Sequence, residues 1–137
     1  MRVFLDTNVL VSAFATRGLC SDVLRHVLSE HELIVGEVIL EELRRVLRDR
    51  IKLPSGFISA VEQLLREQEV VPRPHEPSGL AIRDESNRWV LASALEGRAD
   101  VLVTGDRDLL DIASQTPLTI VDPRGYWSFF HKNHPKN

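Results

Sequence analysis

The sequence predicts an α/β protein in which a largely parallel β-sheet lies between helices. Five short runs rich in Val, Leu, Ile and Phe are bounded by polar residues or glycine, which is typical of buried strands. Between them lie segments whose apolar residues recur at helical spacing. Strands that are separated by helices form βα units, and such units place their strands parallel to one another in one sheet.

The first half of the chain predicts two strands and four helices. The apolar runs over 2–6 and 32–35 are expected to be strands. Pro54 separates the last two helices, because proline disfavours the continuation of a helix. Apolar residues at helical spacing predict the helices over 8–14, 21–30, 37–52 and 55–68.

The second half continues the same alternation. Three prolines between residues 72 and 78 predict a loop. Strands are expected over 69–71, 101–104 and 118–121, with helices over 86–96 and 108–113. Aromatic residues near the C-terminus are expected either to close the core or to mediate an oligomer contact: Tyr126, Trp127, Phe129 and Phe130.

Length and composition are those of one globular domain. The chain has 137 residues, of which 43% are hydrophobic and 27% charged, and its formal net charge is -3. We expect a single domain over residues 1–130 and a flexible tail over 131–137. No apolar run reaches the ~18 to 20 residues of a membrane span, and the single cysteine, Cys20, cannot form an internal disulfide. These features favour a cytoplasmic protein that does not contact membranes.

Two aspartates follow apolar runs at corresponding positions. Asp6 closes the run over 2–6, and Asp106 comes directly after the run over 101–104 and a glycine. Ligand sites of parallel sheets lie just beyond the carboxyl ends of the strands, where the strand order reverses. Two carboxylates delivered there could converge on a hard cation. The sequence therefore indicates a metal-dependent enzyme.

A third candidate acid lies on the helix predicted over 37–52. Helical-wheel geometry at ~100° per residue places Glu42 within the apolar arc, whereas Glu41 points to the opposite side among arginines. A carboxylate on a buried arc needs a partner, since an unpaired buried charge is costly. Glu42 could be a structural ion pair with an arginine or a metal ligand, and the two strand-end aspartates favour the ligand.

Further polar residues lie close to these acids. Asp84 and Asn87 share one helix face, and Asp84 could equally cap the helix that follows, a frequent role for aspartate. Asp108 could likewise cap the helix after Asp106. Asn8 and Thr104 lie beside the strand-end aspartates, where an amide and a hydroxyl could orient the two carboxylates.

Basic side chains near the acids could bind nucleic acid. Contacts to phosphate groups position a strand without reading its sequence. A solvated helix surface with salt bridges is an equally good interpretation of the basic run that follows Glu42. The candidate nucleic-acid-binding residues are Arg44, Arg45, Arg48, Arg88 and Arg107.

Several motifs resemble, in order along the chain, the PilT N-terminus (PIN) domain family. They are Leu5-Asp6-Thr7-Asn8-Val9, Glu42 within Leu-Glu-Glu-Leu, and Leu91-Ala92-Ser93-Ala94 leading into residues 99–110. The match extends from residue 3 to about residue 125. The nearest group is that of the small stand-alone PIN proteins that are toxins of toxin–antitoxin pairs. The resemblance implies a five-stranded parallel sheet between helices and a ribonuclease that depends on Mg²⁺ or Mn²⁺.

The resemblance also implies roles for individual residues. An aspartate is usual where this chain has Asn87, whose amide oxygen could bind a cation but brings no charge. Losing one charge should weaken Mg²⁺ binding, and Asp84, one turn earlier on the same face, could partly replace it as a metal ligand. Carried over by position, the metal-site and catalytic acids are Asp6, Glu42 and Asp106, the supporting residues are Asn8 and Thr104, and a further metal-site acid is Asp108.

The sequence therefore predicts a metal-dependent endoribonuclease that hydrolyses RNA phosphodiester bonds, with an antitoxin protein as a partner and a homodimer as the family-level expectation. The alternative is a PIN-fold regulator that binds RNA or protein and whose catalysis is weakened by Asn87. A phosphatase or phospho-acceptor domain is a third hypothesis. It is disfavoured because no second aspartate lies two residues after Asp6.

Overall fold

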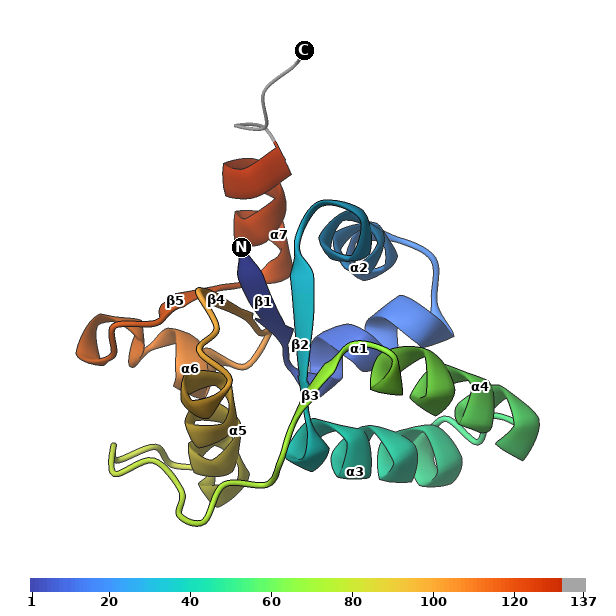
Figure 1. Cartoon of the computed structure of the whole chain (residues 1–137), viewed down its shortest axis with the longest axis horizontal. Helices are drawn as coiled ribbons and strands as arrows, with labels where there is room; N and C mark the ends of the chain where they lie inside the picture. The colour runs from blue at the N-terminus through green and yellow to red at the C-terminus, as the bar shows by residue number, and fades with distance from the viewer. Residues whose placement is uncertain (132–137) are drawn as a thin grey trace.

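The computed structural model describes residues 1–131 and contains the five-stranded parallel sheet that the sequence predicts (Figure 1). The strand order is β3-β2-β1-β4-β5, and every neighbouring pair is parallel. The strands are β1 (Arg2–Leu5), β2 (Glu32–Gly36), β3 (Glu69–Val71), β4 (Val101–Val103) and β5 (Thr119–Val121).

Helices connect the strands and flank the sheet (Figure 1). They are α1 (Thr7–Ala15), α2 (Leu19–Glu30), α3 (Glu37–Arg45), α4 (Ser55–Arg66), α5 (Glu85–Glu96), α6 (Arg107–Leu110) and α7 (Pro123–Tyr126). Three further helical segments are short. They are a π-helical turn over Val46–Arg50, a 3-10 turn over Ala113–Gln115 and a π-helical turn over Trp127–His131. The α/β class and the helical layers predicted from the sequence are thus confirmed.

The strand order reverses between β1 and β4. The chain builds outward from β1 to β2 and β3, and then returns to the other side of β1 for β4 and β5. Leu5 pairs with Val103, and the Asp6 N–H donates to the Val103 carbonyl at 2.9 Å. The carboxyl ends of β1 and β4 are therefore neighbours at the switch point, which is where open parallel sheets bind ligands.

The structure differs from the sequence prediction mainly at the ends of elements. The first strand ends at Leu5, because Asp6 already caps α1. The helix predicted over 37–52 becomes π-helical at Val46, a change of winding that apolar spacing does not reveal. α7 and the turn after it have no counterpart in the prediction, because α7 is only one turn long.

The sheet and the helices share one hydrophobic core. Phe4, Ile34 and Leu102 on the central strands are fully buried. Tyr126 is also fully buried, so this residue closes the core, whereas Phe129 is 61% exposed. An oligomer contact through the aromatic residues stays a prediction. The predicted tail lies outside the described residues from position 132 onward.

No helix within residues 1–131 combines the length and the apolar character that crossing a membrane requires.

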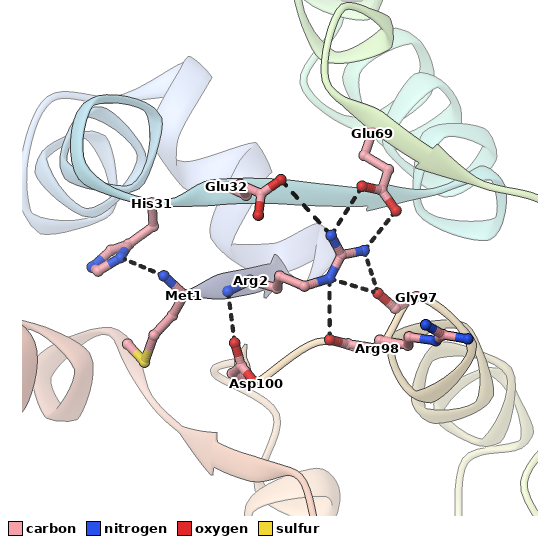
Figure 2. A network of polar contacts seen from close by, with 8 residues as sticks. All are labelled: Met1, Arg2, His31, Glu32, Glu69, Gly97, Arg98 and Asp100. Carbon is pink, nitrogen blue, oxygen red and sulfur yellow. Dashed lines mark hydrogen bonds and ion pairs between the residues drawn. The ribbon is translucent and has the colours of Figure 1, made fainter.

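At the edge of the sheet opposite the switch point, Arg2 joins three segments of the chain (Figure 2). Its guanidinium donates to both carboxylate oxygens of Glu69 on β3, at 3.0 and 2.6 Å. It also donates to the carbonyl oxygens of Gly97 at 2.6 Å and Arg98 at 3.2 Å, just after α5. The Arg2 N–H donates to the Asp100 carboxylate at 2.8 Å. Arg2 therefore fixes β1 to β3 and to the loop that leads into β4.

Gly97 lets this loop approach the sheet closely. A Cβ at this position would lie 2.8 Å from Val71 Cγ2 and 2.9 Å from Ile34 Cγ2, closer than real Cβ contacts allow. Because glycine has no side chain, the carbonyl group of Gly97 can reach the guanidinium of Arg2.

We predict that Arg2→Met lowers the free energy of unfolding by about 1–2 kcal/mol, because several charge-assisted hydrogen bonds are lost at a partly exposed site. Urea unfolding followed by circular dichroism would measure the change. Arg25→Met is the matched control, since Arg25 forms only an exposed salt bridge with Asp22 within α2, and should change stability by less than about 0.5 kcal/mol. Equal effects of the two substitutions would contradict a joining role for Arg2.

Candidate active site

Three aspartates near the switch point cap the helices that follow them. Asp6 accepts a hydrogen bond from the Thr7 N–H at 2.7 Å, at the start of α1. Asp106 accepts one from the Asp108 N–H at 2.9 Å, at the start of α6. Asp84 caps α5 in the same way at 3.0 Å. Free N–H groups at helix N-termini stabilise negative charge, so the local structure holds each carboxylate in a fixed place.

These three aspartates line one pocket of about 380 Å³ at the carboxyl edge of the sheet, which we call the acidic pocket. Glu42 reaches it from α3, and Asn87 reaches it from α5. The other polar side chains of its wall are Thr7, Asn8, Ser12, Thr16, Arg50 and Ser86. The structure thus brings together most of the residues that the sequence proposes as metal ligands.

Asp6 is the most enclosed of the acids, with only 3% of its surface exposed. Its Oδ2 accepts hydrogen bonds from the Thr104 hydroxyl at 2.7 Å and from the Asn8 amide at 3.3 Å. Burial raises the pKa of Asp6 from its ordinary value of 3.8 to about 6, and the negative charges of Glu42 and Asp106 also raise it. The hydrogen bonds from Thr104 and from the Thr7 N–H only partly offset these causes.

Thr104 and Asn8 tie the two strand ends together. The Thr104 hydroxyl, which donates to Asp6, also accepts from the Asp106 N–H at 3.0 Å. The side-chain oxygen of Asn8, Oδ1, accepts from the Gly105 N–H at 3.0 Å, while the side-chain nitrogen Nδ2 donates to Asp6. Each of these side chains therefore contacts Asp6 and the segment that carries Asp106, so the separation of the two acids is fixed.

Glu42 is half-buried and is held by α1. Its Oε1 accepts a hydrogen bond from the Thr7 hydroxyl at 2.6 Å. None of the salt bridges formed among residues 1–131 involves Glu42, so the ion pair with an arginine that the sequence left open is not formed. The neighbouring Glu41 instead pairs with Arg73 at 3.0 Å on the outer side of α3.

The close packing of α3 and α5 depends on Gly36, which caps α3. A Cβ at position 36 would collide with the Ser93 hydroxyl on α5 and would lie 3.1 Å from Phe4 Cζ. The absence of a side chain therefore allows α5 to lie against the start of α3. This approach brings Asn87 of α5 and Glu42 of α3 to the same pocket.

Asn87, where the resemblance described above predicts an aspartate, is 5% exposed and acts as a hydrogen-bond donor. Its amide nitrogen donates to Asp106 Oδ2 at 3.0 Å. An aspartate at this position would place a second negative charge beside Asp106. The asparagine therefore reduces the repulsion in the pocket and orients Asp106 from the side opposite its capping contact.

Asp108 lies apart from the other candidate ligands. It is absent from the lining of the acidic pocket, and its carboxylate accepts from the Arg83 guanidinium with both contacts at 3.3 Å. The suggestion that Asp108 caps its helix is wrong, because Asp106 precedes α6 and accepts from the Asp108 N–H. Asp108 sits in the first turn, and its side chain is directed to the exposed Arg83.

The predicted nucleic-acid-binding arginines divide into two groups. Arg44, Arg48 and Arg88 form salt bridges with Glu62, Asp49 and Glu85, respectively. Arg44 and Arg48, within the basic run that follows Glu42, are thus salt-bridged, as the alternative interpretation of that run expects. Arg45 and Arg107 form no salt bridge or side-chain hydrogen bond with residues 1–131, and both are exposed.

Arg50 belongs to the basic run after Glu42 that the sequence proposes as a positive surface for RNA, and the structure places it in the wall of the acidic pocket. It ends the π-helical turn that follows α3 and is exposed. A π turn changes the angular position of every residue after it, so α-helical spacing does not show that Arg50 reaches the acidic pocket. It is the one cation in the wall of this pocket within the described part of the chain.

The donor set of the acidic pocket suits a hard divalent cation. All candidate ligands offer oxygen, which Mg²⁺ and Mn²⁺ prefer. Among residues 1–131, no three acidic, histidine or cysteine side chains already lie close enough together to hold a metal ion. Mg²⁺ keeps several waters and commonly uses only one or two protein carboxylates beside substrate phosphates. An open pocket with spaced carboxylates therefore fits such a cation.

Fold and pocket define an α/β protein with an acid-lined site at the switch point of a parallel sheet. The chain matches the family model of the PIN domain over residues 2–108. Because this match covers most of the chain, the chain belongs to the PIN domain family, whose members are typically nucleases. A search of curated proteins found no match.

Two solved structures are similar in fold. One is VapBC2 from Rickettsia felis bound to a DNA fragment from their promoter, at 18% identity and a TM-score of 0.65, with 89% of this chain and 98% of that chain covered. The other is VapBC-1 from nontypeable Haemophilus influenzae, at 20% identity and a TM-score of 0.63, with 90% and 99% covered.

We predict that Asp6→Asn stabilises the metal-free protein at neutral pH and loses this advantage in acid. The pKa of Asp6 is raised on folding, so between about pH 4 and pH 6 the folded state binds the proton more tightly, and stability falls as the pH rises. A shift of this size corresponds to about 2–3 kcal/mol above pH 6.

Urea unfolding in the presence of a chelator would measure both proteins at about pH 4 and about pH 7.5. From about pH 4 to about pH 7.5, the unfolding free energy of the wild type should fall by about 2 kcal/mol relative to that of Asp6→Asn. The hydrogen bonds to Asp6 favour its charged form, and the pKa of about 6 already includes this effect. A difference in unfolding free energy between the two proteins that does not depend on pH would show that folding does not raise the pKa of Asp6.

Proposed function

We propose that this PIN domain is a divalent-metal-dependent endoribonuclease that acts as a toxin of a toxin–antitoxin pair. The observation that carries the proposal is the convergence of Asp6, Glu42, Asp84 and Asp106 on one pocket at the switch point. Family membership supports hydrolysis of a nucleic acid. A divalent cation can activate a water molecule for attack on phosphorus, so no side chain need act as a covalent nucleophile.

Asp6, Glu42 and Asp106 would hold the cation, with Asp84 and the amide oxygen of Asn87 as further ligands from α5. When bound, the cation lowers the pKa of a water molecule and neutralises charge on the phosphate that is cleaved. The residues around the ligands keep them in place. Thr7 holds Glu42, as described above, while Thr104 and Asn8 hold the two strand-end aspartates. Asp108 is assigned no place among the ligands, because Arg83 occupies its carboxylate.

The chain's own cations would hold the RNA strand. Arg50 lies in the wall of the acidic pocket, where it can contact a phosphate group next to the one that is cleaved. Arg45 and Arg107 are exposed and lie on α3 and α6 beside the acids, so they can contact phosphates further along the strand. Arg44, Arg48 and Arg88 would first have to break their salt bridges, so we expect them to contribute less to RNA binding.

The proposed partner is an antitoxin protein. The motifs of the chain resemble toxins of toxin–antitoxin pairs, and both similar solved structures are VapBC structures. A cytoplasmic location belongs to the same proposal, since RNA substrates are found there. The proposal also includes a homodimer, which is the family-level expectation.

A second candidate function is a PIN-fold regulator with weakened catalysis, and one contact favours it. The Asn87 amide donates to Asp106 Oδ2, so this oxygen is partly engaged and the pocket has one carboxylate fewer than the family pattern. Such a protein would bind RNA or a protein partner without efficient cleavage. Metal-dependent cleavage by the wild type separates the two functions.

We predict that the purified protein cleaves single-stranded RNA in the presence of Mn²⁺ or Mg²⁺ and that a chelator abolishes cleavage. Asp6→Asn and Glu42→Gln should each reduce the rate by more than about tenfold, because each removes a negative charge from the pocket. Gel analysis of a fluorescent oligoribonucleotide would give the rates.

Asp122→Asn is the matched control for this experiment. Asp122 also follows a strand and caps a helix, α7, by accepting from the Gly125 N–H at 2.6 Å, but it does not line the acidic pocket. Its substitution should leave the rate unchanged. Cleavage that persists in Asp6→Asn and Glu42→Gln, or that needs no cation, would defeat the proposed mechanism.

We further predict that Asn87→Asp increases cleavage at low Mg²⁺ concentration and destabilises the metal-free protein. The new carboxylate adds charge for the cation, but it loses the donor contact to Asp106 and repels it. Rates at several Mg²⁺ concentrations and thermal unfolding in a chelator test both parts. If Asp84 already supplies the charge, Asp84→Asn will be severe and Asn87→Asp mild. Equal rates in wild type, Asn87→Asp and Asp84→Asn would show that neither position reaches the metal.

A further inference from the structure

A second pocket adjoins the acidic pocket. It has a volume of about 430 Å³ and lies between α3, α5 and the loop after β3. Glu42 and Ser86 belong to the walls of both pockets. A polymer that lies in the acidic pocket can therefore extend directly into the second one. We call it the tryptophan pocket, after Trp89 in its wall.

Trp89 and Arg73 form a flat aromatic and cationic surface in this pocket. The Arg73 guanidinium carbon lies 4.7 Å from the centroid of the Trp89 ring, a distance typical of cation–π contacts. The same guanidinium donates to Glu41 at 3.0 Å, so it is held from two sides. The Arg73 side chain is 53% exposed, which leaves much of its surface open to the pocket.

Arg45 completes the wall with a positive charge that no acid neutralises by direct contact. It lines the tryptophan pocket from α3 and makes no salt bridge with residues 1–131, unlike Arg44 beside it. The pocket therefore combines a stacking surface with a cation that is available for a phosphate. Single-stranded RNA is recognised by this pair of features, aromatic rings or arginine planes for bases and cations for the backbone.

We propose that the tryptophan pocket is a nucleotide subsite, in which one unpaired base of the RNA stacks on the Trp89–Arg73 pair while Arg45 contacts the adjoining phosphate. The proposal rests on the proposed ribonuclease function and assigns a substrate class to the region beside the scissile bond. The stacked base belongs to a nucleotide next to the cleaved phosphate, because the two pockets share Glu42 and Ser86. A duplex would not fit this role, since its bases are already stacked and paired.

Intrinsic fluorescence tests the subsite directly, because the chain has only two tryptophans. In the double variant Asp6→Asn, Trp127→Phe, RNA is not consumed and Trp89 is the remaining emitter. Titration with an unstructured oligoribonucleotide should quench this emission and saturate. An oligomer of the same length and charge that lacks the bases should quench it little. Absence of quenching, or equal quenching by both oligomers, would overturn the proposal.

Four substitutions separate stacking from charge and from folding. Arg73 is an exposed loop residue, so Arg73→Ala and Arg73→Lys should leave the fold intact. The lysine keeps the charge but loses the flat guanidinium. Both should weaken binding, by about fivefold or more, whereas Trp89→Phe should retain most of it because a ring remains. Trp89→Leu should raise the KM for RNA by about tenfold or more in otherwise wild-type protein. Unchanged binding in Arg73→Lys together with an unchanged KM in Trp89→Leu would overturn the subsite.

The same measurements distinguish this proposal from the proposed function. If the wild type does not cleave RNA with Mn²⁺ but Trp89 is quenched by the oligoribonucleotide alone, the nuclease assignment fails and the subsite stands. If the wild type cleaves RNA and Trp89→Leu, with an unchanged melting temperature, cleaves it with the same KM, the nuclease assignment stands and the subsite is wrong.

Discussion

The rest of the site depends on the burial of one carboxylate, that of Asp6, at the junction of β1 and α1. A buried carboxylate is costly unless hydrogen bonds satisfy it. Here the first N–H of α1, the Thr104 hydroxyl and the Asn8 amide all donate to it. Two of these donors also contact the segment that carries Asp106. Satisfying Asp6 therefore fixes the relative positions of β1, β4 and the helices that follow them.

The aspartates that we propose as metal ligands also cap helices, and capping leaves room for the proposed role. Each capping carboxylate gives one oxygen to its helix, and its second oxygen is directed elsewhere. For Asp106 that oxygen meets the Asn87 amide, and for Asp6 it meets Thr104 and Asn8. Capping keeps the acids in place without a cation, although burial, and to a lesser extent repulsion by Glu42 and Asp106, raises the pKa of Asp6. A bound cation would relieve that repulsion and would therefore stabilise the fold further.

The sequence predicts the features that follow from local patterns and from the topology of parallel sheets. Buried apolar runs give the five strands, and strand ends place Asp6 and Asp106 at one edge. Contacts between distant segments could not be predicted in this way. The π-helical turn brings Arg50 to the acidic pocket, Arg83 takes up Asp108, and a proline-rich loop lays Arg73 on Trp89. Each depends on backbone geometry or loop position that spacing along the chain does not encode. Roles of these residues in metal and RNA binding stay predictions.

We propose above that the acidic pocket binds a divalent cation through Asp6, Glu42 and Asp106. Anomalous diffraction from crystals soaked in Mn²⁺ tests it most directly, because the scattering locates the metal without assumptions about activity. We expect an anomalous peak in the acidic pocket, with oxygen atoms of at least two of these three carboxylates around it, and no peak there in Asp6→Asn crystals. Full occupancy of a manganese site elsewhere on the chain, with the acidic pocket empty, would contradict it.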